Sequence, residues 1–238
     1  MRLRNYIIYV AVFLFYACSP NYILQSSHHE LIEVKTPIDS TILAIIKPYQ
    51  ESIEDQMNEV LSYTKNNLNK GKPQSTIGNF VTDLCLNYTD AHLCVMNNGG
   101  LRTTINKGNI TRGKIYELMP FENELVVLEL NKHDYLVLLS YIIKRGGEPF
   151  SGITITMDEK GNIINNSSSS PVDFENGEKI KVITSDYLAN GGDKMSFFKD
   201  KKQKKVGIKL RDAIIDYCEK TDTIDVKIDD RIKIINNE

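Results

Sequence analysis

Apolar residues recur along the chain at two spacings, and each spacing predicts one kind of element. Over residues 41–60 they stand three or four positions apart, which predicts a helix that Ser40 or Thr41 could cap. A similar pattern predicts a second helix over residues 77–88, capped by Ser75 and Thr76. Two further helices are predicted over residues 131–144 and 210–220, the first ended by the Gly146-Gly147 pair.

Short apolar runs predict the strands, because β-branched and aliphatic residues favour buried sheet positions. They fall at residues 93–96, 115–118, 125–130, 153–157 and 180–184. Polar segments predict a loop at 65–71, a turn at 158–162, a low-complexity loop at 165–170 and an exposed basic loop at 199–205. Strands and helices alternate irregularly. The expected fold class is therefore α+β (mixed α/β), a mixed β-sheet with packed helices, rather than a doubly wound sheet.

The first residues predict a targeting segment. Arg2 and Arg4 precede an apolar stretch that is too short to cross a bilayer comfortably, and Ala17-Cys18 follows it. This order resembles a bacterial lipoprotein signal peptide, in which Cys18 carries the lipid. A short membrane anchor or an ordinary signal peptide is the alternative. The expected organisation is a signal peptide over 1–18, a tether over 19–38 and one domain over 39–238, located in the cell envelope.

Composition narrows the classes of partner. The chain has 238 residues, enough for one domain with a substantial core, and its formal net charge is -2. The chain has no general excess of cations that would indicate nucleic-acid binding. Cys85, Cys94 and Cys218 lack the spacing of a zinc site, so no metal or cofactor is expected on this chain. Cys85 and Cys94 are predicted to be small core residues, and one disulfide among the three cysteines is left open.

Candidate chemistry lies in two polar loops that each contain a Gly-Gly pair and each follow an apolar run. One is Asn97-Asn98-Gly99-Gly100-Leu101-Arg102, and the other is Asn190-Gly191-Gly192-Asp193. Paired glycines let the backbone turn sharply and approach a ligand closely. Amide, guanidinium and carboxylate groups beside them hold phosphates and ribose hydroxyls. Together the loops predict a nucleotide site assembled from both halves of one domain.

Each side chain at this site also has a simpler explanation. Arg102 is placed to bind a phosphate, but it could pair with a surface carboxylate. Asn97 could bond a ligand or only its own turn. Phe121, in Pro120-Phe121-Glu122-Asn123, suits stacking on a base, with core burial as the alternative. Tyr187 could form a second stacking face, and Asp193 suits a ribose diol.

With these segments the chain resembles the C-terminal domain of the 5'-nucleotidases and of related UDP-sugar and cyclic-nucleotide phosphohydrolases. The matching segments, in the family's order, are Gly78-Asn79 with Asp83, Asn97 to Arg102, Gly108 with Ile110-Thr111, Pro120 to Asn123, Ser151-Gly152 and Tyr187 to Asp193. The resemblance implies that Phe121 and Tyr187 sandwich the base and that Asp193 holds the ribose. It also implies that Arg102 and Asn97 hold the phosphate side. Asn123 and the loop residues Gly99, Gly100, Asn190, Gly191 and Gly192 complete the expected substrate site.

The chain departs from the family pattern at three places. A second phosphate-binding Arg is expected shortly before Gly78, where Lys70 and Lys72 stand instead, without bidentate geometry. Lys194-Met195 replaces a common Gly-Phe. The largest departure concerns the ligand segments of a two-metal phosphatase. No Gly-Asn-His segment occurs in the 238 residues, and the one Asp-x-His match, Asp90-Ala91-His92, is not accompanied by the other expected ligands.

Three hypotheses remain from the sequence. The favoured one is the nucleotide-binding half of a split 5'-nucleotidase in extracytoplasmic nucleotide catabolism, inactive alone. A separate metallophosphatase chain would then supply a pair of divalent metal ions. The second is a surface nucleotide-binding lipoprotein with no catalytic role, and the third is a structural domain that binds nothing. The expected partners are a nucleotide or nucleoside, the metallophosphatase and a membrane reached through the lipid.

Overall fold

The structure, a computed structural model, describes residues 39–168 and 170–235. The expected signal peptide with Cys18, and the expected tether over 19–38, lie outside these residues. The chain divides into two compact units, residues 1–44 and 45–238. Within the described residues, no helix is both long enough and apolar enough to cross a membrane.

The first helix, α2 (Ser40–Asn58), confirms the first predicted helix, but its cap differs from the prediction. Asp39 Oδ1 accepts hydrogen bonds from the backbone N–H groups of Thr41, at 2.8 Å, and Ile42, at 3.3 Å. These bonds lower the pKa of the Asp39 carboxyl. Asp39 therefore caps the helix, in place of Ser40 or Thr41. No residue of α2 is buried, although its apolar residues follow helical spacing.

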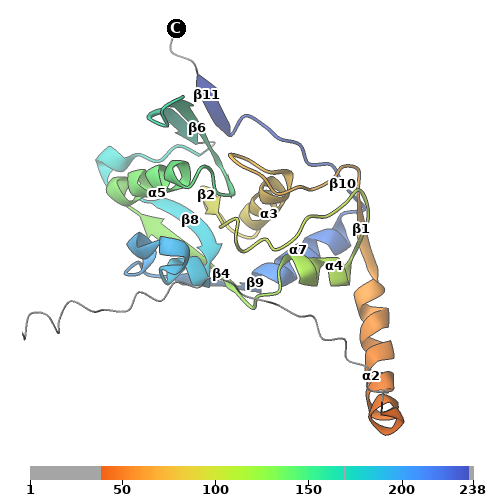
Figure 1. Cartoon of the computed structure of the whole chain (residues 1–238). Helices are drawn as coiled ribbons and strands as arrows, with labels where there is room; N and C mark the ends of the chain where they lie inside the picture. Colours follow the sequence, from red (N-terminus) through yellow and green to blue (C-terminus); the bar gives the residue numbers. More distant parts are fainter. Residues whose placement is uncertain (1–38, 169, 236–238) are drawn as a thin grey trace, which may run out of the picture. The chain divides into compact units, whose positions relative to one another are not determined.

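A five-stranded sheet with the order β5-β2-β8-β4-β9 lies at the centre of the second unit (Figure 1). Its strands are β2 (Leu93–Val95), β4 (Glu124–Leu130), β5 (Phe150–Ser151), β8 (Ile180–Ser185) and β9 (Lys204–Lys209). The β2–β8 pair is parallel and the other three pairs are antiparallel, so the sheet is mixed, as predicted.

Side chains of the central sheet alternate between two cores, as the period of a strand requires. Along β4, Leu125 and Val127 face one core, whereas Val126, Leu128 and Leu130 face the other. The helices α3 (Thr76–Leu86), α4 (Arg112–Leu118) and α7 (Leu210–Lys220) pack on the first side. The helices α5 (Lys132–Lys144) and α6 (Asp186–Ala189) pack on the second side. The strands β2, β4 and β8 are therefore largely buried on both faces, whereas β9 at the edge has no buried residue.

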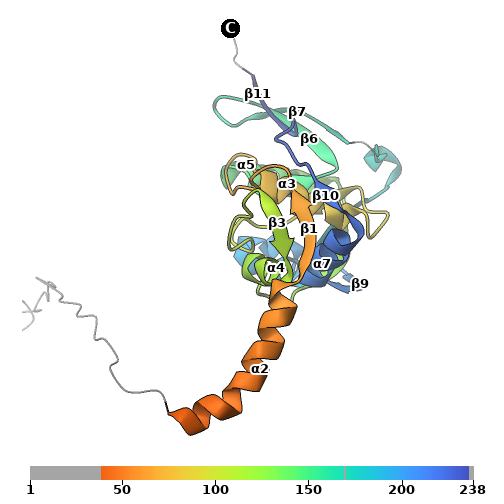
Figure 2. The ribbon, with the colours of Figure 1, turned by 90° about the vertical axis from the view of Figure 1, so that its right-hand side faces the viewer.

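Two small sheets flank this arrangement (Figure 2). One has the order β10-β1-β3 and contains β1 (Val60–Thr64), β3 (Gly108–Thr111) and β10 (Thr223–Ile224). The other has the order β11-β6-β7 and contains β6 (Ile153–Asp158), β7 (Ile163–Ser168) and β11 (Ile232–Ile235). Three short 3-10 helices, η1 (Phe174–Asn176), η2 (Gly192–Lys194) and η3 (Ser196–Phe198), complete the described elements.

Most predicted elements are confirmed, and three are wrong. Residues 115–118 are the end of helix α4, because Thr111 caps that helix by accepting a hydrogen bond from Lys114 N–H at 3.2 Å. The predicted loop over 165–170 belongs in part to β7, a strand of mostly polar residues whose backbone pairs antiparallel with β6. The basic loop over 199–205 ends earlier than expected, since β9 begins at Lys204. All three described cysteines are buried, unpaired thiols, as predicted for Cys85 and Cys94.

Candidate functional site

The strand register brings the two Gly-Gly loops to one edge of the central sheet. β2 and β8 run parallel with Cys94 opposite Ile183, so the residues that follow both strands leave at the same edge. β4 runs antiparallel to β8 with Leu125 opposite Ser185, so the residues that precede β4 join them there. The segments around Asn97, Phe121 and Tyr187 therefore meet, although they are distant in sequence.

Asn97 and Asp193 join the two loops directly. The Asn97 side-chain amide donates a hydrogen bond to Asp193 Oδ2 at 3.0 Å. The alternative, in which the Asn97 side chain satisfies only its own turn, is therefore wrong. Backbone groups hold the second loop as well, because Asp193 N–H donates to the Tyr187 hydroxyl at 3.1 Å and Asp193 C=O accepts from Tyr141 at 2.7 Å. Asp193 has a left-handed φ of 48°.

Arg145, which has no recognisable signature in the sequence, is the second partner of Asp193. Its Nη2 donates to Asp193 Oδ1 at 2.8 Å, and its Nε donates to Glu148 Oε1 at 3.0 Å. The other oxygen of the buried Glu148 accepts from Asn98 N–H at 2.7 Å. Asn98 also donates its side-chain amide to Gly147 C=O at 2.9 Å. A third Gly-Gly segment thus joins the site, and its only signal in the sequence was the Gly146-Gly147 pair assigned to a helix end.

Electrostatics at this junction follows from the contacts. The hydrogen bond to Glu148 raises the pKa of the Arg145 guanidinium, which stays charged. Burial, and after it the nearby Asp193 carboxylate, raises the pKa of the Tyr141 phenol to about 12. Tyr141 therefore remains a neutral donor at physiological pH. Each Asp193 oxygen already accepts one bond and keeps further lone pairs that can accept ligand hydroxyls.

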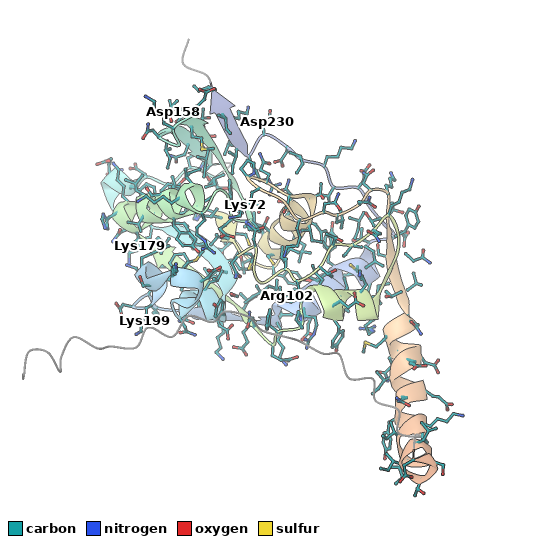
Figure 3. All side chains as sticks on the ribbon, viewed as in Figure 1. Lys72, Arg102, Asp158, Lys179, Lys199 and Asp230 are labelled. Carbon is teal, nitrogen blue, oxygen red and sulfur yellow. The ribbon has the colours of Figure 1, made fainter. Side chains whose placement is uncertain are left out.

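Arg102 lies exposed on the first loop and is not engaged by a carboxylate (Figure 3). Its backbone N–H donates to Leu118 C=O at 2.9 Å, and its Nη1 donates to Gly99 C=O at 3.2 Å. Among the described residues, no acidic group forms a salt bridge with it. The surface ion pair considered as an alternative is therefore absent from the described part of the chain, and the guanidinium is accessible to an anion.

Phe121 and Tyr187 both present exposed rings. Phe121 is 42% exposed and Tyr187 is 48% exposed, so burial of Phe121 in the core, the alternative considered above, is wrong. Tyr187 is held close to the second loop: a Cβ on Gly192 would lie 2.5 Å from Tyr187 C=O and 2.6 Å from its ring. Only glycine fits there without a shift. Gly100 has a comparable role, because its Cβ would lie 2.8 Å from Asn97 Oδ1.

The remaining expected residues have more peripheral positions. Asn190 Oδ1 accepts from Gln203 at 2.9 Å and takes no part in the Asp193 contacts. Asn123 accepts a backbone hydrogen bond from Leu210 at 2.8 Å. Gly99 is exposed, and Gly191 adopts a left-handed φ of 89°. Their roles in binding stay predictions.

Of the two lysines considered as substitutes for a second Arg, Lys70 and Lys72, Lys72 contacts the residue that precedes the third Gly-Gly segment. Its ammonium donates a hydrogen bond to Arg145 C=O, next to the third Gly-Gly segment (Figure 3). Lys70 is exposed and precedes it in the same segment. Lys72 therefore places a point charge beside the third Gly-Gly segment, without the bidentate geometry of a guanidinium.

A groove of considerable volume lies away from these loops, and the described residues contain no metal-binding cluster. The groove has a volume of about 850 Å³ and is lined by Lys179, Lys181, Glu129 and the start of β9, at the opposite end of the sheet. Most of its lysines have acidic partners, for example Lys181 with Asp90. Within the described ranges, no three His, Cys, Asp or Glu side chains are grouped so that they could hold a metal ion. The donor set of a two-metal phosphatase site is thus not met by these residues.

Comparison with known proteins identifies the family of this chain. The family model described as the 5'-nucleotidase C-terminal domain matches residues 56–200, more than half of the chain. The chain belongs to the 5'-nucleotidase C-terminal domain family. The match contains the Asn97, Phe121 and Tyr187 segments that the sheet brings together. The mixed α/β fold and the resemblance inferred from the sequence are therefore confirmed.

Relatives of this domain are longer proteins. An apyrase of Tabanus yao is 25% identical over 258 aligned positions, covering 93% of this chain and 46% of the apyrase. A 5'-nucleotidase of Vibrio vulnificus is 25% identical over 55% of this chain and is covered over 26% of its own length. Among solved structures, a 5'-nucleotidase precursor from Thermus thermophilus has a TM-score of 0.70 and 25% identity, covering 85% of this chain and 44% of that one. The chain thus spans less than half the length of these proteins.

Proposed function

We propose that this chain is the nucleotide-binding half of a split 5'-nucleotidase. The observation that carries the proposal is the Asn97–Asp193 contact, which joins two polar loops beside two exposed aromatic rings. In this proposal Phe121 and Tyr187 stack on the base, Asp193 accepts the ribose hydroxyls and Arg102 binds the phosphate. The glycines of both loops, with Asn123 and Asn190, shape the rim.

Hydrolysis in this proposal comes from a separate metallophosphatase chain. Two metal ions on such a chain would activate water and stabilise the phosphoryl oxygens. The present chain would contribute no catalytic group, since its described residues offer no metal-binding cluster. Its part is to orient the nucleotide with the phosphate at Arg102, facing the partner.

We also propose an extracytoplasmic location, with Cys18 carrying a lipid. The order of Arg2, Arg4, the apolar stretch and Ala17-Cys18 supports this location. A relative 28% identical over 68% of the chain is a cell wall protein of Listeria monocytogenes. Cys18→Ser is expected to abolish metabolic labelling with a fatty acid, measured on the immunoprecipitated protein. Unchanged labelling would exclude Cys18 as the acceptor.

The test of the split enzyme is phosphate release from AMP. The full chain in detergent is assayed with manganese, with and without the metallophosphatase chain of the same organism. Activity only in the mixture, lost with Arg102→Ala and with Asp193→Ala, is the expected result. Lys179→Ala is the matched control, because Lys179 is an exposed cation of the distant groove (Figure 3).

Other outcomes decide between the hypotheses. Nucleotide binding without activity in the mixture would support a surface nucleotide-binding lipoprotein. Activity from this chain alone would contradict the proposal, since it would require a catalytic site on the chain. The absence of both binding and activity would leave a structural domain.

A further inference from the structure

The loop that carries Phe121 is held by side chains at the start of α7, the cap residue Lys209 and Arg211. Arg211 Nη2 donates a hydrogen bond to Glu122 Oε1, and its Nη1 lies 3.5 Å from Met119 C=O. Lys209 donates to the other Glu122 oxygen. Contacts therefore reach the residues on both sides of Pro120-Phe121.

The buried guanidinium of Arg211 has its acidic partner, Glu122, on the loop that carries Phe121. Arg211 is 6% exposed, and its guanidinium carbon lies 4.3 Å from the centroid of the Tyr116 ring. Within the described part of the chain, Glu122 is its only acidic partner and its Nε has no hydrogen-bond partner. Burying a charge is costly unless it is paired. The position of Arg211 is therefore tied to the position of Glu122.

Backbone bonds hold both ends of the same loop while its tip stays accessible. Leu210 N–H donates to Asn123 C=O at 2.8 Å, and Arg102 N–H donates to Leu118 C=O at 2.9 Å. Phe121, between these anchors, is 42% exposed. An exposed ring on an unanchored loop would lose conformational freedom when a base stacks on it, and this loss weakens binding. The anchors reduce that loss in advance.

We propose that Arg211, acting through Glu122, is a positioning residue that preorganises Phe121 for stacking on the base. The inference rests on the proposed function, because it assumes that a nucleotide base stacks on Phe121. Arg211 itself touches no ligand. It raises the affinity for the base indirectly, by holding the loop of Phe121 from the α7 side of the sheet.

A structural role alone would have a different signature. If Arg211 only joined α4 to α7, its loss would lower stability and weaken every ligand equally. If it positions Phe121, the loss falls on ligands with a base and spares those without one. AMP and ribose 5-phosphate make this comparison, since they share ribose and phosphate and differ in the base.

The experiment measures the affinity of the full chain in detergent for both ligands by calorimetry, with the free energy of unfolding measured in parallel. The variants are Arg211→Ala, Arg211→Lys, Glu122→Gln and the double variant. Lys205→Gln is the matched control, because Lys205 forms an exposed ion pair with Glu124, at 2.6 Å, on the neighbouring strands. Glu122→Gln changes an exposed side chain, so it tests the same contact if Arg211→Ala folds poorly.

Complete loss of one stacking face lowers affinity by about 5- to 150-fold. We expect Arg211→Ala and Glu122→Gln each to weaken AMP by about fivefold or more, and ribose 5-phosphate by less than about twofold. Arg211→Lys should recover part of the loss, and the double variant should be no worse than the poorer single one. Equal loss for both ligands, or no loss for AMP, would overturn the inference. Failure of the unaltered chain to bind AMP would refute the proposed function itself.

Discussion

Replacing Arg145 by methionine removes a guanidinium that contacts two carboxylates, Glu148 and Asp193, while keeping a side chain of similar length. The Glu148 side chain is 1% exposed and would keep only its bond from Asn98 N–H. A hydrogen bond to a charged group contributes about 1.5–3 kcal/mol, and breaking a fully buried ion pair costs about 3–5 kcal/mol.

The loss expected here lies near the lower end of these ranges. The Arg145 side chain is 36% exposed, so water screens part of its charge. We expect Arg145→Met to lower the free energy of unfolding by about 2 kcal/mol, which corresponds to a fall in Tm of about 4–8 °C for a domain of this size. AMP affinity should also fall, by about fivefold, because Asp193 loses one of the two groups that orient its carboxylate.

Urea unfolding measures the first effect, on the chain with Arg145→Met, with Glu148→Gln and with both. The double variant should lose less than the sum of the single losses, since the neutral amide introduced by Glu148→Gln no longer needs a cation. Lys144→Met is the control, because Lys144 is the exposed neighbour at the same helix end, and its change should stay within about 0.5 kcal/mol. Additive losses, or an Arg145→Met effect no larger than the control's, would refute the reasoning.

Three further predictions concern the aromatic rings and their supports. Tyr187→Phe should weaken AMP by less than about threefold, since the ring remains and one hydrogen bond is lost, whereas Tyr187→Ala should cost about fivefold or more by calorimetry. Gly192→Ala should approach the loss of Tyr187→Ala, because the added methyl collides with that tyrosine; unchanged AMP affinity would contradict this. Hydrogen bonds from Lys209 and then Arg211 lower the pKa of Glu122 to about 2. A carboxyl whose pKa is depressed by folding stabilises the fold fully above its unfolded pKa, here 4.5, and this stabilisation is lost as the pH falls toward 2. The Glu122 carboxyl should therefore titrate near 2 by NMR, and at a higher pH in Arg211→Ala.

Sequence pattern predicted β2, β4 and β8 of the central sheet, because these strands are largely buried and form continuous apolar runs. It missed β5, which has only two residues, and β9, whose lysines interrupt any apolar run. It failed where the surroundings decide the element. Residues 115–118 look like a strand, but Ile115 and Leu118 stand three apart and are both buried, as on one face of helix α4. β7 has few apolar residues, so no local pattern marks it as a strand. Its strand conformation depends on pairing with β6. The apolar spacing of α2 predicted a helix correctly, yet it could not show that every residue of the helix is outside the core.

The candidate site was predictable in its loops but not in its connections. Glycine pairs and polar side chains after strands drew attention to Asn97, Arg102 and Asp193 as candidates, because such loops have a local signature. That Asn97 donates to Asp193 depends on the order of strands in the sheet, which no local pattern contains. Arg145 was hidden for a related reason: a basic residue before Gly-Gly at a helix end satisfies the rules of helix termination without any further role. In the structure it is the residue that contacts both Asp193 and Glu148, so the third loop, and not only the two with recognisable sequences, sets the geometry of the candidate site.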